Sequence, residues 1–135
     1  MSKSAIYVVN NTTQNVAVNG TINPGVVVRR FGCNLRLENN AVREGGTGYY
    51  KYNASFTLSP TAEGEVTITA YKDGVAIPGA IASVTTAAAG DLCNLSLVFI
   101  TKENCVCCED ISNISFVLSE TASDVTNVAI TGEKL

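Results

Sequence analysis

Hydrophobic and polar residues alternate with a period of two along most of the chain. In YYKYNASFTLS, residues 49–59, the apolar Tyr50, Tyr52 and Phe56 are separated by polar residues. This alternation is typical of a β-strand with one buried face and one solvent-facing side. EVTITAY, CNLSLVF and SNISFVLSE repeat the pattern. We expect the core to contain Tyr50, Tyr52, Phe56, Ile68, Leu95, Leu97, Phe99, Phe116 and Leu118.

Residues that favour turns separate these predicted strands. Asn19-Gly20, Pro24-Gly25 and Pro78-Gly79 each lie between apolar runs, and Asp73-Gly74 favours a type I′ hairpin turn. No long segment has the spacing of an amphipathic helix, and the chain contains no linker or repeat. About ten short strands at regular spacing predict an all-β fold, a two-sheet antiparallel jelly-roll sandwich. Residues 1–135 are expected to form this single domain.

One predicted strand is apolar on both of its faces. In NLSLVFITK, residues 94–102, one face carries Leu95, Leu97 and Phe99, and the other carries Val98 and Ile100. A strand that is apolar on both faces needs a second surface to cover it. Either a loop of the same chain or a neighbouring subunit supplies that cover. We favour a subunit interface.

Composition and charge narrow the possible functions. Hydrophobic residues make up 46% of the chain and charged residues 16%, compared with about 25% charged in ordinary globular proteins, so partners are expected to cover part of the surface. A net charge of -3 without a basic patch argues against nucleic-acid binding. No apolar run approaches the ~20 residues of a membrane helix. The amino terminus lacks the apolar core of a signal peptide, which predicts synthesis in the cytoplasm.

The residue inventory also argues against catalysis. The chain contains no histidine, which excludes hydrolase mechanisms that use an imidazole base. The acidic pair Glu63 and Glu65 lies beside a turn, where solvated charge is the expected role. We therefore predict that the protein is not an enzyme and needs no cofactor.

Three cysteines, Cys105, Cys107 and Cys108, lie within four positions of one another. Three alternatives are open: free thiols, disulfides formed between subunits after release from the cytoplasm, or a metal site. Three thiolates without histidine do not complete a tetrahedral zinc site, so a metal would need ligands from more than one subunit. The other two cysteines, Cys33 and Cys93, lie in apolar alternation and are expected in the core.

Four segments in order resemble the trimeric jelly rolls of the complement globular-head and tumour-necrosis-factor superfamily, above all its small bacterial and bacteriophage members. They are GTGYYKYNASFTL, VTITAYKDGVAIPGA, DLCNLSLVFIT and TNVAITGEKL. The most specific pieces are Gly48-Tyr49-Tyr50 and the Tyr71-Lys72-Asp73-Gly74 hairpin. The chain lacks the signal peptide of the secreted members and the collagen-like stalk of the spore-surface members.

The resemblance implies a homotrimer and a structural function. Its threefold interface would include Val98, Ile100 and Tyr49, and it would place the three clustered cysteines at one end of the assembly. The expected role is a head or decoration module of a phage particle or of a bacterial spore or cell surface, where another structural protein of the particle is a further candidate partner. The alternative is a receptor- or glycan-binding adhesive tip, in which exposed Tyr7 and Tyr49 contact the ligand.

Overall fold

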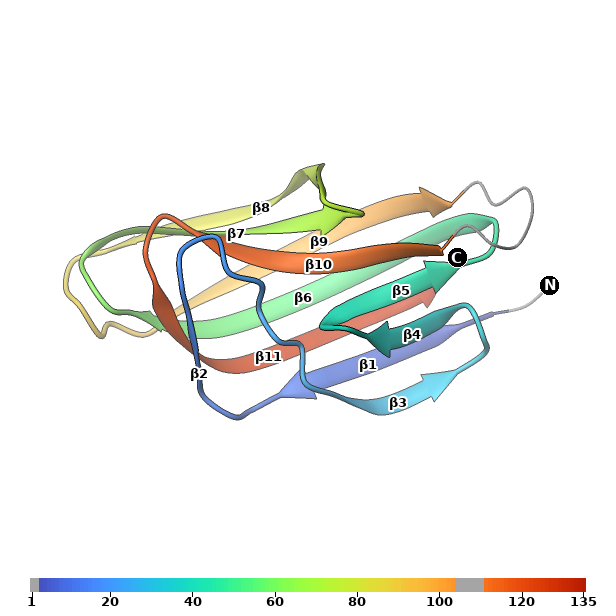
Figure 1. The fold of residues 1–135 in the computed structure, drawn as a ribbon, viewed down its shortest axis with the longest axis horizontal. Coiled ribbons are helices and arrows are strands. Elements are labelled where there is room, and N and C mark those ends of the chain that lie inside the picture. Colours follow the sequence, from blue (N-terminus) through green and yellow to red (C-terminus); the bar gives the residue numbers. More distant parts are fainter. Residues whose placement is uncertain (1–2, 104–110) are drawn as a thin grey trace.

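The computed structural model describes residues 3–103 and 111–135, and in these residues it contains strands but no helix (Figure 1). Eleven strands form two antiparallel sheets that pack face to face. The all-β jelly-roll prediction is therefore confirmed. No helix in the described residues is long and apolar enough to cross a membrane.

Sheet A contains the longest described strand, β6 (Gly48–Pro60), with 13 residues. Its order is β3 (Val26–Phe31), β1 (Ala5–Asn10), β11 (Ser123–Lys134), β6 (Gly48–Pro60) and β9 (Cys93–Glu103), and the short β2 (Gln14–Val16) also pairs with β11. The edges of this sheet are thus β3 and β9. β1 begins where β11 ends, because Ala5 pairs with Glu133.

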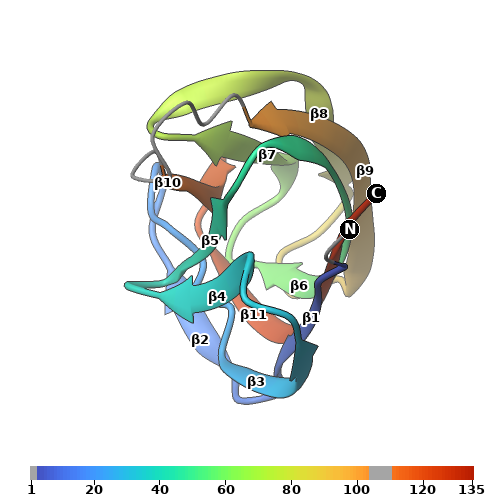
Figure 2. The ribbon, with the colours of Figure 1, turned by 90° about the vertical axis from the view of Figure 1, so that its right-hand side faces the viewer.

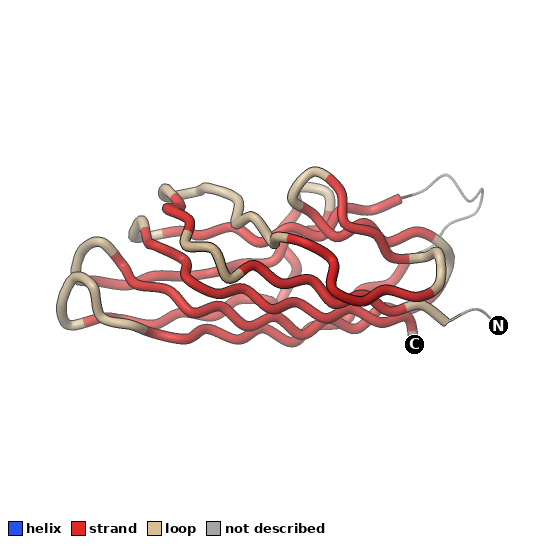
Figure 3. Tube along the Cα trace, turned by 90° about the horizontal axis from the view of Figure 1, so that it is seen from below, coloured by secondary structure: helices blue, strands red, loops and turns tan. Residues whose placement is uncertain are grey.

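Sheet B packs against one face of sheet A, as the end-on view in Figure 2 shows. Its order is β4 (Leu35–Glu38), β5 (Ala41–Gly45), β10 (Ile111–Ser119), β7 (Gly64–Lys72) and β8 (Val75–Thr86). Strands account for most of the length of the molecule, and several of them are joined by short turns at its ends (Figure 3).

The space between the sheets holds the core that the alternation predicts. All nine predicted core side chains are buried. Tyr52 stacks on Phe99 with 5.2 Å between ring centroids, and Phe116 lies 6.1 Å from Phe99 and 5.3 Å from Phe56. The backbone of Gly132 lies so close to this cluster that a Cβ added there would be 2.8 Å from the Tyr52 ring. The aromatic cluster therefore needs glycine at that position of β11.

The hairpin between β7 and β8 has the predicted turn. Asp73 and Gly74 have φ angles of 51° and 81°, and Lys72 pairs with Val75 across the two-residue loop. Positive φ at both central residues defines a type I′ turn, whose twist matches that of the flanking strands. The prediction from Asp73-Gly74 is confirmed.

The prediction for the two isolated cysteines was wrong for one of them. Cys33 is exposed because it lies in the bend between β3 and β4, where Gly32 has a φ of 80° and interrupts the alternation. Cys93 is half-buried and packs against the core. Its thiol donates to the carbonyl of Leu58 at 3.6 Å, and burial raises the pKa of that thiol.

Candidate functional site

The outer face of sheet A carries the side chains that the sequence singled out for assembly. Because Tyr50 and Tyr52 point into the core, their neighbours on β6 point outward. Tyr49 is 51% exposed, and on β9 the fractions for Val98 and Ile100 are 61% and 56%. In the described part of the chain, no loop covers these two aliphatic side chains. The prediction of a β9 that is apolar on both faces is confirmed, and its covering partner remains a prediction.

Strand register extends this surface across the sheet. Tyr7 on β1 pairs with Thr131 on β11, Thr131 pairs with Asn53 on β6, and Asn53 pairs with Val98 on β9. The row therefore runs from an aromatic to an aliphatic side chain without a charge. We call the outward-facing residues of β1, β11, β6 and β9 the assembly face.

The next row of the assembly face contains one pair of opposite charges. Ala5 pairs with Glu133, Glu133 with Lys51, and Lys51 with Ile100. Opposite charges on neighbouring strands attract each other. This row adds no net charge, and the outward-facing Lys102 on β9 and Asp124 on β11 also have opposite signs, so the face as a whole carries little net charge.

Two adjoining hollows make the assembly face uneven. One has a volume of about 340 Å³ and is lined in part by Tyr7, Phe31 and Lys51. The other, of about 260 Å³, is lined in part by Val98. Asn53 and Thr131 line both of them. The surface can therefore accept side chains that protrude from a partner.

The two exposed tyrosines differ in how much of the ring they offer. The ammonium group of Lys102 lies 5.5 Å from the centroid of the Tyr49 ring, within cation–π range. That contact occupies one side of the ring. Tyr7 is 37% exposed and lines the larger hollow. Of the two, Tyr7 has the more suitable surroundings for contact with a ligand.

A buried polar cluster lies between the sheets, near the end where β9 and β11 finish. Glu44 on β5 is fully buried. Its Oε1 accepts hydrogen bonds from the hydroxyls of Tyr52 at 2.5 Å and Thr101 at 2.7 Å. Lys72 at the end of β7 places its Nζ 3.8 Å from Glu44 and 3.5 Å from the buried Glu103. The cluster therefore joins side chains from both sheets.

Charge and burial oppose each other in this cluster. Burial raises the pKa of the Glu44 carboxyl, whereas the hydrogen bonds from Tyr52 and Thr101 and the charge of Lys72 lower it. Burial also raises the pKa of Tyr52, and the charge of Glu44 adds to this rise. Within the described residues, the Oε2 atoms of Glu44 and Glu103 accept no hydrogen bond. A proton bound between the two carboxyls would satisfy both atoms.

No pattern in the sequence indicated this cluster. Glu44 shares the inward face of β5 with Val42, but an acidic residue just before two glycines is normally read as exposed. Its partners come from β6, β7 and β9, which are distant in the sequence. Because both carboxyls are buried between the sheets and contact side chains from each of them, we assign the cluster a role in joining the sheets.

The three clustered cysteines, Cys105, Cys107 and Cys108, lie outside the described residues. In residues 3–103 and 111–135, no three His, Cys, Asp or Glu side chains form a group that could hold a metal ion. The flanking strand ends are described: Glu103 pairs with Gly48, and Ile111 pairs with Gly45. The alternatives for these thiols remain predictions.

Comparisons with known proteins agree with the predicted fold. Neither a protein-family model nor a curated protein sequence matches the chain. Among solved structures, mouse APRIL aligns over 99% of this chain and 100% of its own, with 12% identity and a TM-score of 0.73. The vertex protein P5 of phage PRD1 aligns over 98% and 96%, with 14% identity and a TM-score of 0.60.

The globular domain of the zebrafish complement 1qA protein is a third similar structure. It aligns over 97% of this chain and 95% of its own, with 9% identity and a TM-score of 0.63. At these identities the likeness concerns the fold alone. The chain has the tumour-necrosis-factor-like jelly-roll fold, which confirms the resemblance drawn from the sequence.

Proposed function

We propose that this protein is a non-enzymatic structural protein that assembles as a homotrimeric jelly-roll head or decoration module. Its expected location is a phage particle or the surface of a bacterial spore or cell. The exposure of Val98 and Ile100 on the assembly face carries this proposal. A phage vertex protein of the same fold supports it.

The energetics of the assembly face favour burial by another copy. Full burial of a valine or isoleucine side chain contributes about 1.5 to 3 kcal/mol relative to exposure. A stable interface covers about 800 Å² of each partner, so the contact would include more of the assembly face than Val98 and Ile100. The hollows beside Tyr7 and Val98 would receive side chains from the neighbour.

Light scattering coupled to size exclusion tests the assembly. We expect a mass of about 42 kDa, three times the chain mass of 14.1 kDa. Val98→Asp should lower the mass toward the monomer while the circular dichroism spectrum stays unchanged, because Val98 makes little contact with its own chain. Ile81→Asp is the matched control, since Ile81 is 56% exposed on β8 of sheet B. A monomeric wild-type protein, or equal loss of mass in both variants, would reject the proposal.

The cysteine segment and the location have separate tests. A non-reducing gel of the assembled protein would show bands that disappear on reduction if Cys105, Cys107 or Cys108 joins subunits. Mass spectrometry of purified virions or spores from the producing strain would detect the chain among the particle proteins. Detection in the soluble lysate alone would contradict the surface location.

A second candidate function is binding of a glycan or protein receptor. The observation in its favour is the position of the half-exposed Tyr7 in a hollow with Phe31 and Arg29, because aromatic faces stack on sugars and contribute strongly to interfaces. A glycan array with wild type, Tyr7→Ala and Tyr49→Ala tests it. Binding that Tyr7→Ala abolishes would support this function, and no binding across the array would count against it.

A further inference from the structure

The arginines of this acidic chain gather at one edge of the sandwich. The chain contains four arginines, Arg29, Arg30, Arg36 and Arg43, and all lie on β3, β4 and β5. Between residues 29 and 44 the acidic residues are Glu38 and Glu44, and Glu44 is buried next to Lys72. Within this stretch of sequence four guanidinium groups are thus accompanied by one accessible carboxylate, although the net charge of the chain is -3; Glu133 on β11 lines the hollow next to Arg29 and Arg30 but not the one next to Arg36 and Arg43. Such an asymmetry marks this edge as a site for anions.

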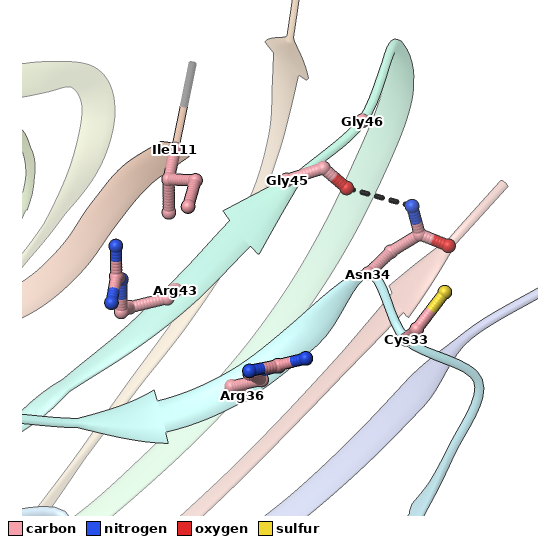
Figure 4. A pocket seen from close by; sticks show the side chains of 7 residues that line it. All are labelled: Cys33, Asn34, Arg36, Arg43, Gly45, Gly46 and Ile111. Atoms are coloured by element: carbon pink, nitrogen blue, oxygen red, sulfur yellow. Dashed lines mark hydrogen bonds between the residues drawn. The ribbon is translucent and has the colours of Figure 1, made fainter. Parts of the chain in front are cut away.

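Two of these arginines line a hollow on the outer face of sheet B (Figure 4). Arg36 on β4 and Arg43 on β5 are directly paired across the hairpin. Asn34, Gly45 and Ile111 form other parts of the wall, and the volume is about 340 Å³. Figure 4 shows Arg43 beside Ile111 and Arg36 extending toward the side of Cys33. The hollow is large enough for a small charged ligand.

The two guanidinium groups are incompletely neutralised. Arg43 forms an ion pair with Glu38 through its Nη1 at 2.5 Å, but its buried Nε has no hydrogen-bond partner in the described part of the chain. Arg36 is exposed, and none of the hydrogen bonds and ion pairs described for residues 3–103 and 111–135 involves it. Like charges directly opposite each other on neighbouring strands destabilise a sheet. An anion in the hollow that both side chains line would offset this repulsion and could accept hydrogen bonds from Arg36.

The wall facing the arginines is held rigidly. The Asn34 side chain donates to the carbonyl of Gly45 at 2.7 Å and accepts from the Ser4 hydroxyl at 2.7 Å. The Tyr50 hydroxyl contacts the carbonyls of Gly45 and Gly46 at 2.9 and 2.8 Å. A Cβ at Gly46 would lie 2.5 Å from the Asn34 amide nitrogen. A site with one fixed wall loses less conformational entropy when a ligand binds.

We propose that this hollow binds a small oxyanion, a carboxylate or a phosphate group, through the guanidinium groups of Arg36 and Arg43. The planar donor fork of arginine matches both groups, because each presents two oxygens to paired N–H donors. Ile111 would contact the apolar part of the ligand. The hollow opens on sheet B, away from the assembly face on sheet A, so this binding site does not depend on the proposed trimer.

Backbone amide NMR of the ¹⁵N-labelled protein tests the site. Sodium glucuronate, a sugar carboxylate, and inorganic phosphate are titrated separately at constant ionic strength maintained with sodium chloride. We expect saturable shifts of the Gly45 and Gly46 amide signals at millimolar concentration, the affinity range of single charged groups. A response to glucuronate alone or to phosphate alone identifies the preferred anion.

Two matched variants decide whether the arginines bind the anion. Arg36→Gln should weaken binding about tenfold, because it removes a charge-assisted hydrogen bond. Arg36 is exposed, so the dispersion of the amide spectrum should stay native. Arg29→Gln removes the same charge from β3 and should leave the affinity unchanged. The absence of saturable shifts with both anions, or equal weakening by the two variants, would overturn the proposal.

Discussion

Replacement of Lys72 by methionine gives the most direct test of the buried cluster. Its ammonium lies 3.8 Å from Glu44 and 3.5 Å from Glu103, and both carboxyls are buried. Methionine keeps most of the apolar stem but removes the positive charge. The variant therefore leaves two carboxyls in the sandwich without a counter-charge.

The expected loss follows from the geometry. At an effective dielectric constant of about 20, each contact contributes about 4 kcal/mol of Coulomb attraction. The cost of removing the charges from water offsets part of this attraction, and the Lys72 side chain is 28% exposed. We expect Lys72→Met to lower the free energy of unfolding by about 2 to 4 kcal/mol near pH 7.

The loss should depend on pH in a defined direction. The Glu44 pKa is already raised in the folded protein, and removal of Lys72 raises it further because the lysine charge lowers it. A carboxyl with a raised folded pKa stabilises the protein most below its unfolded pKa of about 4.5, and this stabilisation is lost as the pH rises through the folded pKa. The deficit of Lys72→Met should therefore shrink on acidification from neutral pH to about pH 5, as Glu44 takes up a proton.

Urea unfolding at several pH values and one fixed protein concentration measures this dependence. Lys3→Met removes an exposed lysine and is the control, with an expected change within about 0.5 kcal/mol. Glu44→Gln should show unchanged or higher stability at neutral pH and a weaker pH dependence, since an amide can accept from Tyr52 and donate to Glu103. A Lys72→Met deficit of equal size at pH 5 and pH 8 would refute the electrostatic explanation and leave the loss of packing and of the hydrogen bond from Lys72 to the Lys102 carbonyl as the causes.

Two further changes test local packing and exposure. Gly132→Ala should destabilise the protein by about 1 to 3 kcal/mol because its methyl group would overlap the Tyr52 ring. Gly74→Ala should cost about 1 kcal/mol, because the added methyl group meets open space but the residue has a φ of 81°. Thermal unfolding of the two variants measures both losses. Exposed Cys33 should react with a thiol reagent much faster than Cys93, as peptide mapping by mass spectrometry would show. Equal rates would contradict the difference in burial between the two thiols.

Regular alternation made most of the fold predictable from the sequence. Tyr50, Tyr52 and Phe56 could be assigned to one face because the side-chain period of a strand is two. Asp73-Gly74 was equally informative, because few dipeptides adopt positive φ twice in succession. These signals are local, so a single sequence reveals them.

Features decided by distant contacts could not be predicted in this way. The burial of Glu44 depends on Lys72 and Thr101, which reach it from other strands. Cys33 lies beside an apolar run, and its exposure follows from the bend at Gly32. The arginine hollow forms because the hairpin register sets Arg36 opposite Arg43. Each of these outcomes depends on which segments pair with one another. The spacing of residues along one segment does not reveal its pairing partner.

The two edges of sheet A bear on how the proposed trimer would form. β3 exposes Val26 and Phe31, and β9 exposes Val98 and Ile100. Exposed apolar edge strands promote association, and two unlike surfaces on one chain favour a head-to-tail contact that either closes into a ring or grows into a filament. In a closed trimer every copy of both edges is covered, whereas a head-to-tail dimer leaves one of each exposed. Weakened variants such as Val98→Asp should therefore populate monomers and trimers with few dimers, and a dominant dimer in light scattering would argue for a different contact.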